Sequence, residues 1–94
     1  MLESVIQSKF IQAVKDKGAG LAVKVDSTSR RGWPDVTWVD RDGHAVFIEF
    51  KQEKGRLTHH QKEIHNELIE LGADVYVVSG EKGLNHFLKQ QGLS

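Results

Sequence analysis

The sequence predicts an α/β fold: a mixed four-stranded sheet flanked by helices, in the order helix, three strands, helix, strand, helix. Three segments have apolar residues at helical spacing, and four short runs are apolar and rich in β-branched residues. A helix-length segment separates the third run from the fourth. Because a strand that returns after a crossover helix usually lies parallel to a neighbour, we expect one parallel pair in the sheet.

The first helix is predicted before Gly18, where apolar residues gather on one helical face: Leu2, Ile6, Phe10, Ala13 and Val14. Gly18 and Gly20 end it. A strand over residues 21–25 follows, and a polar loop over residues 26–32 comes next. The strands Val36–Val39 and 45–50 form a predicted hairpin, because Gly43 supplies the left-handed position that hairpin turns require.

The second helix is predicted to begin at about His59, because Thr58 and Gln61 match a capping box. Its apolar face carries Ile64, Leu68 and Leu71, and Gly72 is placed for a C-terminal cap. Asp74–Ser79 is predicted as a short buried strand. A final helix over residues 81–90 has its apolar face at Leu84, Phe87 and Leu88, with Gly92 after it.

Composition limits the class of protein. Ninety-four residues are expected to form a single domain, residues 1–94. Thirteen basic and thirteen acidic residues cancel, so any nucleic-acid binding must come from local charge. The absence of cysteine excludes disulfides and thiolate zinc sites. No continuous apolar run marks a signal peptide or membrane span, so we expect a cytoplasmic protein that does not enter a membrane.

The hairpin carries the residues with the clearest chemical pattern. If its loop has three residues, Asp40 faces His44, and counting back along both strands puts Asp35 opposite Glu49 with Cβ atoms roughly 5 Å apart. A four-residue loop would shift this register by one. Alternation places Lys51 on the same face as Glu49. Two such close carboxylates favour an oxygen-ligated divalent cation, Mg²⁺ or Mn²⁺.

Each of these residues also has a simpler explanation. Asp35 could close a turn after Pro34, and Glu49 with Lys51 could lie on the exposed face of an edge strand. However, both faces of the segment around Glu49 are partly apolar, with Phe47 on one face and Val46, Ile48 and Phe50 on the other. This pattern favours a central strand, where charged side chains need partners.

Two further polar residues lie on apolar helical faces. Glu3 falls within the stripe formed by Ile6, Phe10 and Val14, which turns an acid toward the sheet. Its place in the first helical turn equally suits an exposed carboxylate near the helix dipole. Gln61 shares a stripe with Ile64, although its capping role already accounts for it.

One ordered set of residues carries a family resemblance: Glu3, Gly32-Trp33-Pro34-Asp35, Glu49-Phe50-Lys51, Gly55, Leu57 and Gln61. It resembles the VRR-NUC family of the PD-(D/E)XK nuclease superfamily, in the compact stand-alone form found in phages and bacteria. The resemblance covers nearly the whole chain and implies a restriction-endonuclease-like core. Asp-x(n)-Glu-x-Lys alone occurs by chance, but the Gly-x-Pro-Asp motif, the helix acid and the later helix make the pattern fairly specific.

The resemblance implies a metal-dependent DNA endonuclease that hydrolyses phosphodiester bonds. Glu3, Asp35, Glu49 and the backbone carbonyl of Phe50 would surround Mg²⁺ or Mn²⁺, and Lys51 would be the catalytic lysine. Phe50 stands where the family often has valine, a departure that a carbonyl ligand tolerates. Similar small members resemble Holliday-junction resolvases, which act as homodimers on branched DNA. A bacterial or phage-infected cell is the implied setting. With Gln61, the candidate catalytic set is Glu3, Asp35, Glu49, Lys51 and Gln61.

Two basic loops are candidates for DNA binding because they flank this site. Their residues are Arg30 and Arg31 on one side and Lys54 and Arg56 on the other, and Ser27 could add a phosphate hydrogen bond. No base-reading motif is visible, so we expect recognition of DNA shape.

Two alternatives compete with this interpretation. Histidine ligands for zinc should be four residues apart on a helix, but His60 and His65 are five apart and His59 and His65 six apart. The second alternative is a non-catalytic, dimeric DNA-binding or scaffold domain with a degenerate nuclease fold. Retention of the whole set of acids and lysine argues against degeneracy.

Overall fold

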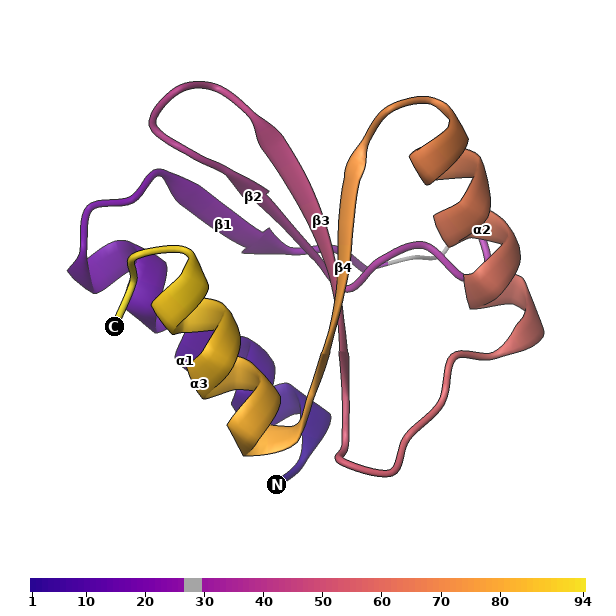
Figure 1. The fold of residues 1–94 in the computed structure, drawn as a ribbon, viewed down its shortest axis with the longest axis horizontal. Helices are drawn as coiled ribbons and strands as arrows, with labels where there is room; N and C mark the ends of the chain where they lie inside the picture. The colour runs from indigo at the N-terminus through magenta and orange to yellow at the C-terminus, as the bar shows by residue number, and fades with distance from the viewer. Residues whose placement is uncertain (27–29) are drawn as a thin grey trace.

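The computed structural model describes residues 1–26 and 30–94, and it confirms the predicted α/β class and order of elements (Figure 1). The boundaries agree with prediction to within about one residue. The elements are α1 (Glu3–Asp16), β1 (Leu21–Lys24), β2 (Val36–Val39), β3 (Ala45–Lys51), α2 (His59–Glu70), β4 (Asp74–Ser79) and α3 (Gly80–Gln90).

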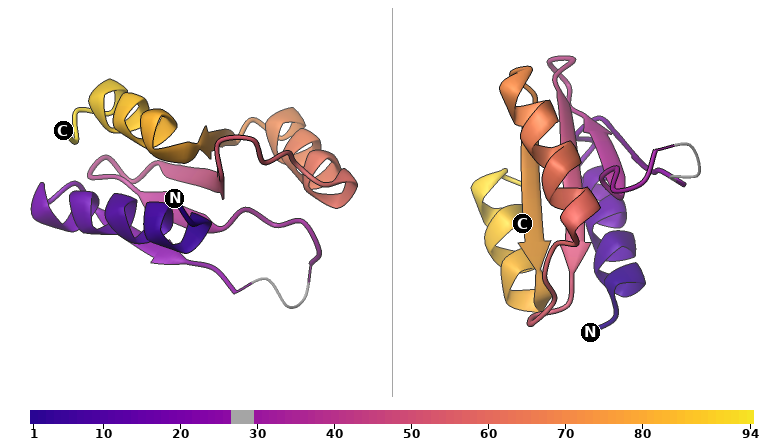
Figure 2. Two further views of the ribbon diagram at one scale, coloured as in Figure 1. Left: turned by 90° about the horizontal axis from the view of Figure 1, so that it is seen from below. Right: turned by 90° about the vertical axis from the view of Figure 1, so that its right-hand side faces the viewer.

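The four strands form one mixed sheet in the order β1-β2-β3-β4. β1 pairs with β2 and β2 with β3 in antiparallel fashion, while β3 and β4 are parallel, as expected after the crossover helix α2. α1 and α3 lie side by side on one face of the sheet, and α2 lies on the opposite face (Figures 1 and 2). β3 is therefore one of the two inner strands and has helices over both faces of the sheet.

The hydrophobic core fills the space between the sheet and the α1–α3 layer. Phe10 of α1 lies at its centre, because its ring centroid is 5.7 Å from those of Trp38, Phe50 and Phe87. Ile48 of β3 faces the same layer and is fully buried. The alternating residues of β3 thus have two environments: one set packs in this core and the other set faces α2.

Two expectations about burial are wrong. The strand Asp74–Ser79 is mostly exposed, because β4 forms the edge of the sheet and only Val78 is buried among its six residues. Leu2 and Leu71, both predicted on apolar helical faces, are 62% and 83% exposed. Each lies just outside the end of its helix, where the chain no longer follows the helical path that would carry the side chain inward.

The β2–β3 turn has three residues, Arg41 to Gly43. The Asp40 N–H donates to the His44 carbonyl over 3.0 Å, and Gly43 has a φ of +84°. The strand register pairs Val36 with Ile48. One step further along both strands, Asp35 stands opposite Glu49, so the register predicted for the three-residue loop is confirmed.

The capping box at the start of α2 is also confirmed. Thr58 accepts a hydrogen bond from the Gln61 N–H, and the Gln61 side chain accepts one from the Thr58 N–H. In residues 1–26 and 30–94, none of the helices has both the length and the apolar composition needed to cross a membrane.

Candidate active site

Pro34 ends the β2–β3 ladder at the position where Asp35 lies. The paired residues of β2 and β3 end at Val36 and Ile48; continued two steps, the register would put Pro34 opposite Phe50 at a hydrogen-bonding position, but proline has no N–H to donate. The Phe50 N–H instead donates to Asp35 Oδ2 over 2.9 Å. The Asp35 carbonyl in turn accepts from the Val25 N–H over 2.7 Å. Both the backbone and the carboxyl group of Asp35 are therefore held in place.

The same interruption affects the carbonyl group of Phe50. In an antiparallel hydrogen-bonded pair, the N–H and C=O of one residue face the same partner. Pro34 is that partner, and it offers no donor to the Phe50 carbonyl. An ordinary residue at position 34 would occupy this oxygen, whereas proline leaves it available for another ligand beside the Asp35 carboxyl group.

Glu49 is the most deeply buried charged residue of the described chain, with 1% of its surface exposed. Burial is the main cause that raises its pKa to about 9, and the hydrogen bond and charge of Asp35 raise it further. The charge of Glu3 acts in the same direction, and that of Lys51 opposes them. Without a cation the Glu49 carboxyl group is therefore protonated at neutral pH.

Lys51 and Glu3 lie near the Glu49 carboxyl group and come from different elements. Lys51 is the last residue of β3, two positions after Glu49 on the same face, and only 9% of its surface is exposed. Glu3 is the first residue of α1 and is half-buried, within electrostatic range of Glu49. Its position in the first turn also suits the helix dipole, and the metal-binding role of Glu3 stays a prediction.

α2 contributes two side chains to Glu49. Gln61 Nε2 donates to Glu49 Oε2 over 3.3 Å, in addition to its capping role. His65 Nε2 lies 3.6 Å from Glu49 Oε1, and burial is the main cause that lowers the pKa of His65, which favours the neutral imidazole. The spacings between histidines do not indicate that His65 belongs to the site. The signal that does is its spacing of four residues from Gln61, because that spacing puts both side chains on one helical face.

Gly32 fixes the loop before Asp35 against the start of α2. Its φ is +88°, and a Cβ atom there would collide with the His60 carbonyl and lie 2.8 Å from the Gln61 nitrogen. The next residue, Trp33, packs edge-on against Phe47 with ring centroids 5.8 Å apart. Close approach at Gly32 thus sets the distance between the Asp35 loop and the helix that carries Gln61.

The basic residues predicted for DNA binding lie on loops at this end of the sheet. The start of β2 and the end of β3 meet here, because the two strands are antiparallel. Arg31, Lys54 and Arg56 are exposed. Arg30 is also exposed and contacts Glu67 of α2 at 3.0 Å. Ser27 falls outside the described residues.

A second acidic group lies at the opposite end of the hairpin. In the described chain, Asp40, Asp42 and His44 are the only three metal-ligand side chains whose ligand atoms all lie within 4.8 Å of one another. Asp40 Oδ1 already accepts the N–H groups of Asp42 and His44. The His44 N–H is the main cause that lowers the Asp40 pKa. These contacts close the turn, so we assign the group a structural role.

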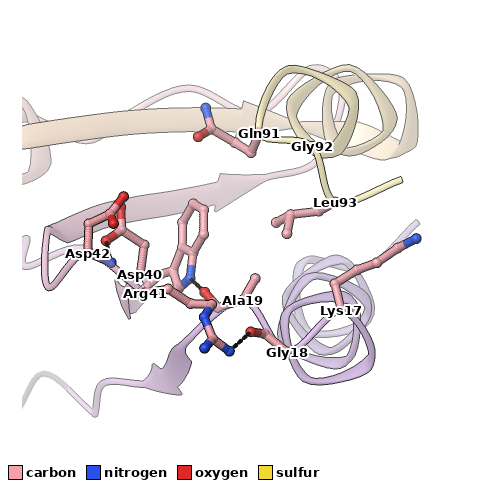
Figure 3. Close-up of a pocket in the computed structure, with 10 residues that line it drawn as sticks. Lys17, Gly18, Ala19, Asp40, Arg41, Asp42, Gln91, Gly92 and Leu93 are labelled. Carbon is pink, nitrogen blue, oxygen red and sulfur yellow. Dashed lines mark hydrogen bonds between the residues drawn. The ribbon is translucent and has the colours of Figure 1, made fainter.

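A shallow pocket adjoins this turn (Figure 3). The segments that follow α1 and α3 line it together with the hairpin turn. Arg41 donates to the Gly18 carbonyl over 3.0 Å, and the Trp38 indole donates to the Ala19 carbonyl over 2.8 Å. These contacts tie the hairpin to the end of α1. The pocket lies at the far end of the sheet from Asp35 and Glu49 and contains none of the predicted site residues.

The donors beside Asp35 suit a hard divalent cation. They are oxygen atoms from two carboxyl groups and a backbone carbonyl, the ligands that Mg²⁺ and Mn²⁺ prefer. Glu49 Oε1 is buried without a hydrogen-bond partner. The fold thus defines an α/β protein with two carboxyl groups and a lysine at one end of its central strands.

Comparison with known proteins identifies the family. Residues 6–82 match the VRR-NUC domain family. A solved structure of a VRR_NUC domain is similar to this chain with a TM-score of 0.82 and 27% identity, over 93% of this chain and 94% of that one. No curated protein matches. The chain therefore belongs to the VRR-NUC family, whose domains are of nuclease type. The matched span contains Asp35, Glu49, Lys51 and Gln61, while Glu3 precedes it.

Proposed function

We propose that residues 1–94 form one nuclease domain, a divalent-metal-dependent DNA endonuclease that hydrolyses phosphodiester bonds. One observation carries this proposal: Pro34 leaves the Phe50 carbonyl without a ladder donor beside the Asp35 and Glu49 carboxyl groups. Lys51 follows on the same face. Family membership supports a nuclease, and this arrangement supports a metal-dependent one.

Asp35, Glu49 and the Phe50 carbonyl hold Mg²⁺ or Mn²⁺ in this proposal, with Glu3 as a further acid. A cation held there would supply Lewis-acid chemistry, a lowered pKa for a bound water and stabilisation of negative charge on the scissile phosphate. Glu3, Asp35 and Glu49 are spaced too widely for one ligand atom from each to lie within 4.8 Å of the others. Such a wide spacing would suit Mg²⁺, which keeps several water ligands when protein ligands are few.

Lys51 positions or deprotonates the attacking water and offsets charge on the pentavalent transition state. Its burial supports this role, because a lysine with only 9% of its surface exposed interacts more strongly with nearby charges than a solvated one does. Gln61 orients the Glu49 carboxyl group through the hydrogen bond to Oε2.

The proposed substrate is DNA, bound by the basic loops on either side of the site. Arg31, Lys54 and Arg56 contact phosphates, with Arg30 and Ser27 as further candidates. We propose selectivity for branched DNA of the Holliday-junction type, because small basic loops can read the shape of the backbone but not the bases. We propose that this activity takes place in the cytoplasm of a bacterial or phage-infected cell, where DNA is accessible.

A homodimer is the proposed assembly, since a branched substrate presents two strands for cutting. Exposed apolar side chains support an interface around β4 and the end of α2: Ile69, Leu71, Tyr76 and Val77 are 56%, 83%, 38% and 45% exposed. Light scattering at several concentrations tests the assembly, and a monomer at all of them contradicts it.

Cleavage of labelled DNA tests the enzyme. A four-way junction, a splayed duplex and a linear duplex are incubated with Mn²⁺, Mg²⁺ or EDTA, using the full chain, Lys51→Ala and the exposed control Lys82→Ala. We expect metal-dependent cleavage of the branched substrates by the full chain and by the Lys82 variant, and loss of cleavage with Lys51→Ala. Cleavage by all three contradicts a nuclease that depends on Lys51. Junction binding without cleavage by any of them contradicts nuclease activity itself. The second outcome supports the non-catalytic DNA-binding domain.

A further inference from the structure

His65 and Gln61 approach the two oxygen atoms of the Glu49 carboxyl group separately. Gln61 Nε2 lies 3.3 Å from Oε2, and His65 Nε2 lies 3.6 Å from Oε1. Both residues project from the same face of α2, one turn apart. The carboxyl group of Glu49 thus contacts α2 through both of its oxygen atoms, and it also interacts with Asp35 and Lys51.

The contact between His65 and Glu49 is close but incomplete. A separation of 3.6 Å exceeds the range of a hydrogen bond, and neither His65 Nε2 nor Glu49 Oε1 has another partner. Both side chains are almost fully buried, with 5% and 1% exposed. Because buried polar atoms without partners are costly, a state of the protein in which these two atoms pair is favoured.

We propose that His65 is a positioning residue that donates a hydrogen bond from Nε2 to Glu49 Oε1 when Glu49 binds a divalent cation. This inference rests on the proposed function, because it assigns Glu49 to the metal site. Carboxylates that bind metals are commonly held by such hydrogen bonds from a surrounding layer of residues, and loss of one typically costs about 10- to 100-fold in metal affinity.

The donor requires a specific tautomer of the imidazole. Only the ring with a proton on Nε2 can donate to Glu49, whereas a proton on Nδ1 would place two acceptors face to face. A purely structural role, in which the ring merely fills space beneath α2, places no requirement on either nitrogen. The tautomer and the effect of a volume-matched replacement therefore separate the two roles.

The first test measures Mn²⁺ binding by calorimetry on the full chain and three variants. His65→Phe keeps a ring of similar size without the donor, His65→Gln keeps a donor at similar reach, and His60→Phe makes the same replacement at an exposed position of the same helix. We expect His65→Phe to weaken Mn²⁺ binding by about tenfold or more. His65→Gln should recover most of the affinity, and His60→Phe should leave it unchanged.

The outcomes distinguish this inference from the proposed function. If the full chain binds Mn²⁺ and His65→Phe binds it equally well, or His65→Gln is as weak as His65→Phe, the positioning role is wrong while the metal site stands. If the full chain does not bind Mn²⁺, both proposals fail. Single-turnover cleavage adds a kinetic check: saturating Mn²⁺ should restore much of the rate of His65→Phe, because the defect lies in holding the cation.

The second test uses the unaltered chain, so it does not depend on how His65→Phe folds. Nitrogen-15 spectra of the imidazole rings are recorded with and without Mg²⁺, and His65→Gln identifies the resonances of His65 among the five histidines. We expect the Nε2–H tautomer in the Mg²⁺-bound protein. The Nδ1–H tautomer under these conditions overturns the proposal.

Discussion

Asp35 Oδ2 accepts the backbone N–H of Phe50 over 2.9 Å, at the point where the β2–β3 ladder stops. The carboxyl group takes the place of the backbone carbonyl that an uninterrupted ladder would supply. Proline at position 34 has no N–H, so it leaves the Phe50 carbonyl without the donor that an uninterrupted ladder would supply.

Two replacements of Asp35 should separate its structural role from its proposed catalytic one. Asp35→Asn keeps a side-chain oxygen for the Phe50 N–H, so its stability in EDTA should stay close to that of the unaltered chain. Asp35→Ala leaves the N–H without a partner and should cost about 1–2 kcal/mol in urea unfolding. Both variants should lose Mn²⁺-dependent cleavage. An Asn variant as unstable as the Ala variant contradicts the role of the hydrogen bond.

Gly32 should be far less tolerant of alanine than Gly72, although their φ angles are +88° and +87°. A Cβ at Gly72 meets nothing within 4 Å, so Gly72→Ala should show only the cost of the left-handed backbone, about 1–2 kcal/mol. Gly32→Ala adds a collision with the backbone of α2, and its loss of stability should exceed that of Gly72→Ala by about 2 kcal/mol. Thermal unfolding of both variants measures the difference, and equal losses contradict close packing of this loop on α2.

The stability of the metal-free protein should fall as pH rises from 7 to 9. The pKa of Glu49 is raised from 4.5 to about 9, so in this window the unfolded chain has lost a proton that the folded chain keeps. Folding then binds a proton, and the free energy of unfolding decreases with pH until about pH 9. The groups that face Glu49 are Asp35, Lys51, Glu3 and the neutral His65.

Urea unfolding in EDTA at several pH values measures this trend. Glu49→Gln carries no titrating proton and should remove most of the decline. The pKa of His65 is lowered by burial from 6.5, so its own destabilising effect appears as the pH falls below that value and does not disturb the alkaline window. An equal decline in the Gln variant would assign the pH dependence to other groups.

Lys54→Ala with Arg56→Ala should weaken junction binding without affecting stability. Both side chains are exposed, and each phosphate contact that is lost should reduce the slope of log K against log salt by about 0.9 on duplex arms. Fluorescence anisotropy between low and high salt measures the slope. Lys89→Ala, in the last turn of α3, is the matched control and should leave it unchanged. An unchanged slope in the double variant removes this loop from the DNA interface.

The register of the hairpin shows how much of the site local sequence determines. Gly43 supports a three-residue turn, and the turn places Asp35 opposite Glu49 and Lys51 on the same face. Each step depends on residues near one another in the chain, where steric limits and strand alternation leave few choices. The capping box that begins α2 is local in the same way.

The edge position of β4 and the contact of His65 with Glu49 were decided only by the tertiary structure. An apolar run such as Val75 to Val78 does not reveal which strand will be its only neighbour, because sheet order depends on long-range pairing. Likewise, helical spacing links His65 to Gln61, but only the packing of α2 on the sheet brings both to Glu49. Sequence by itself determined which residues share a face, and the packing of one face on another determined which of them meet.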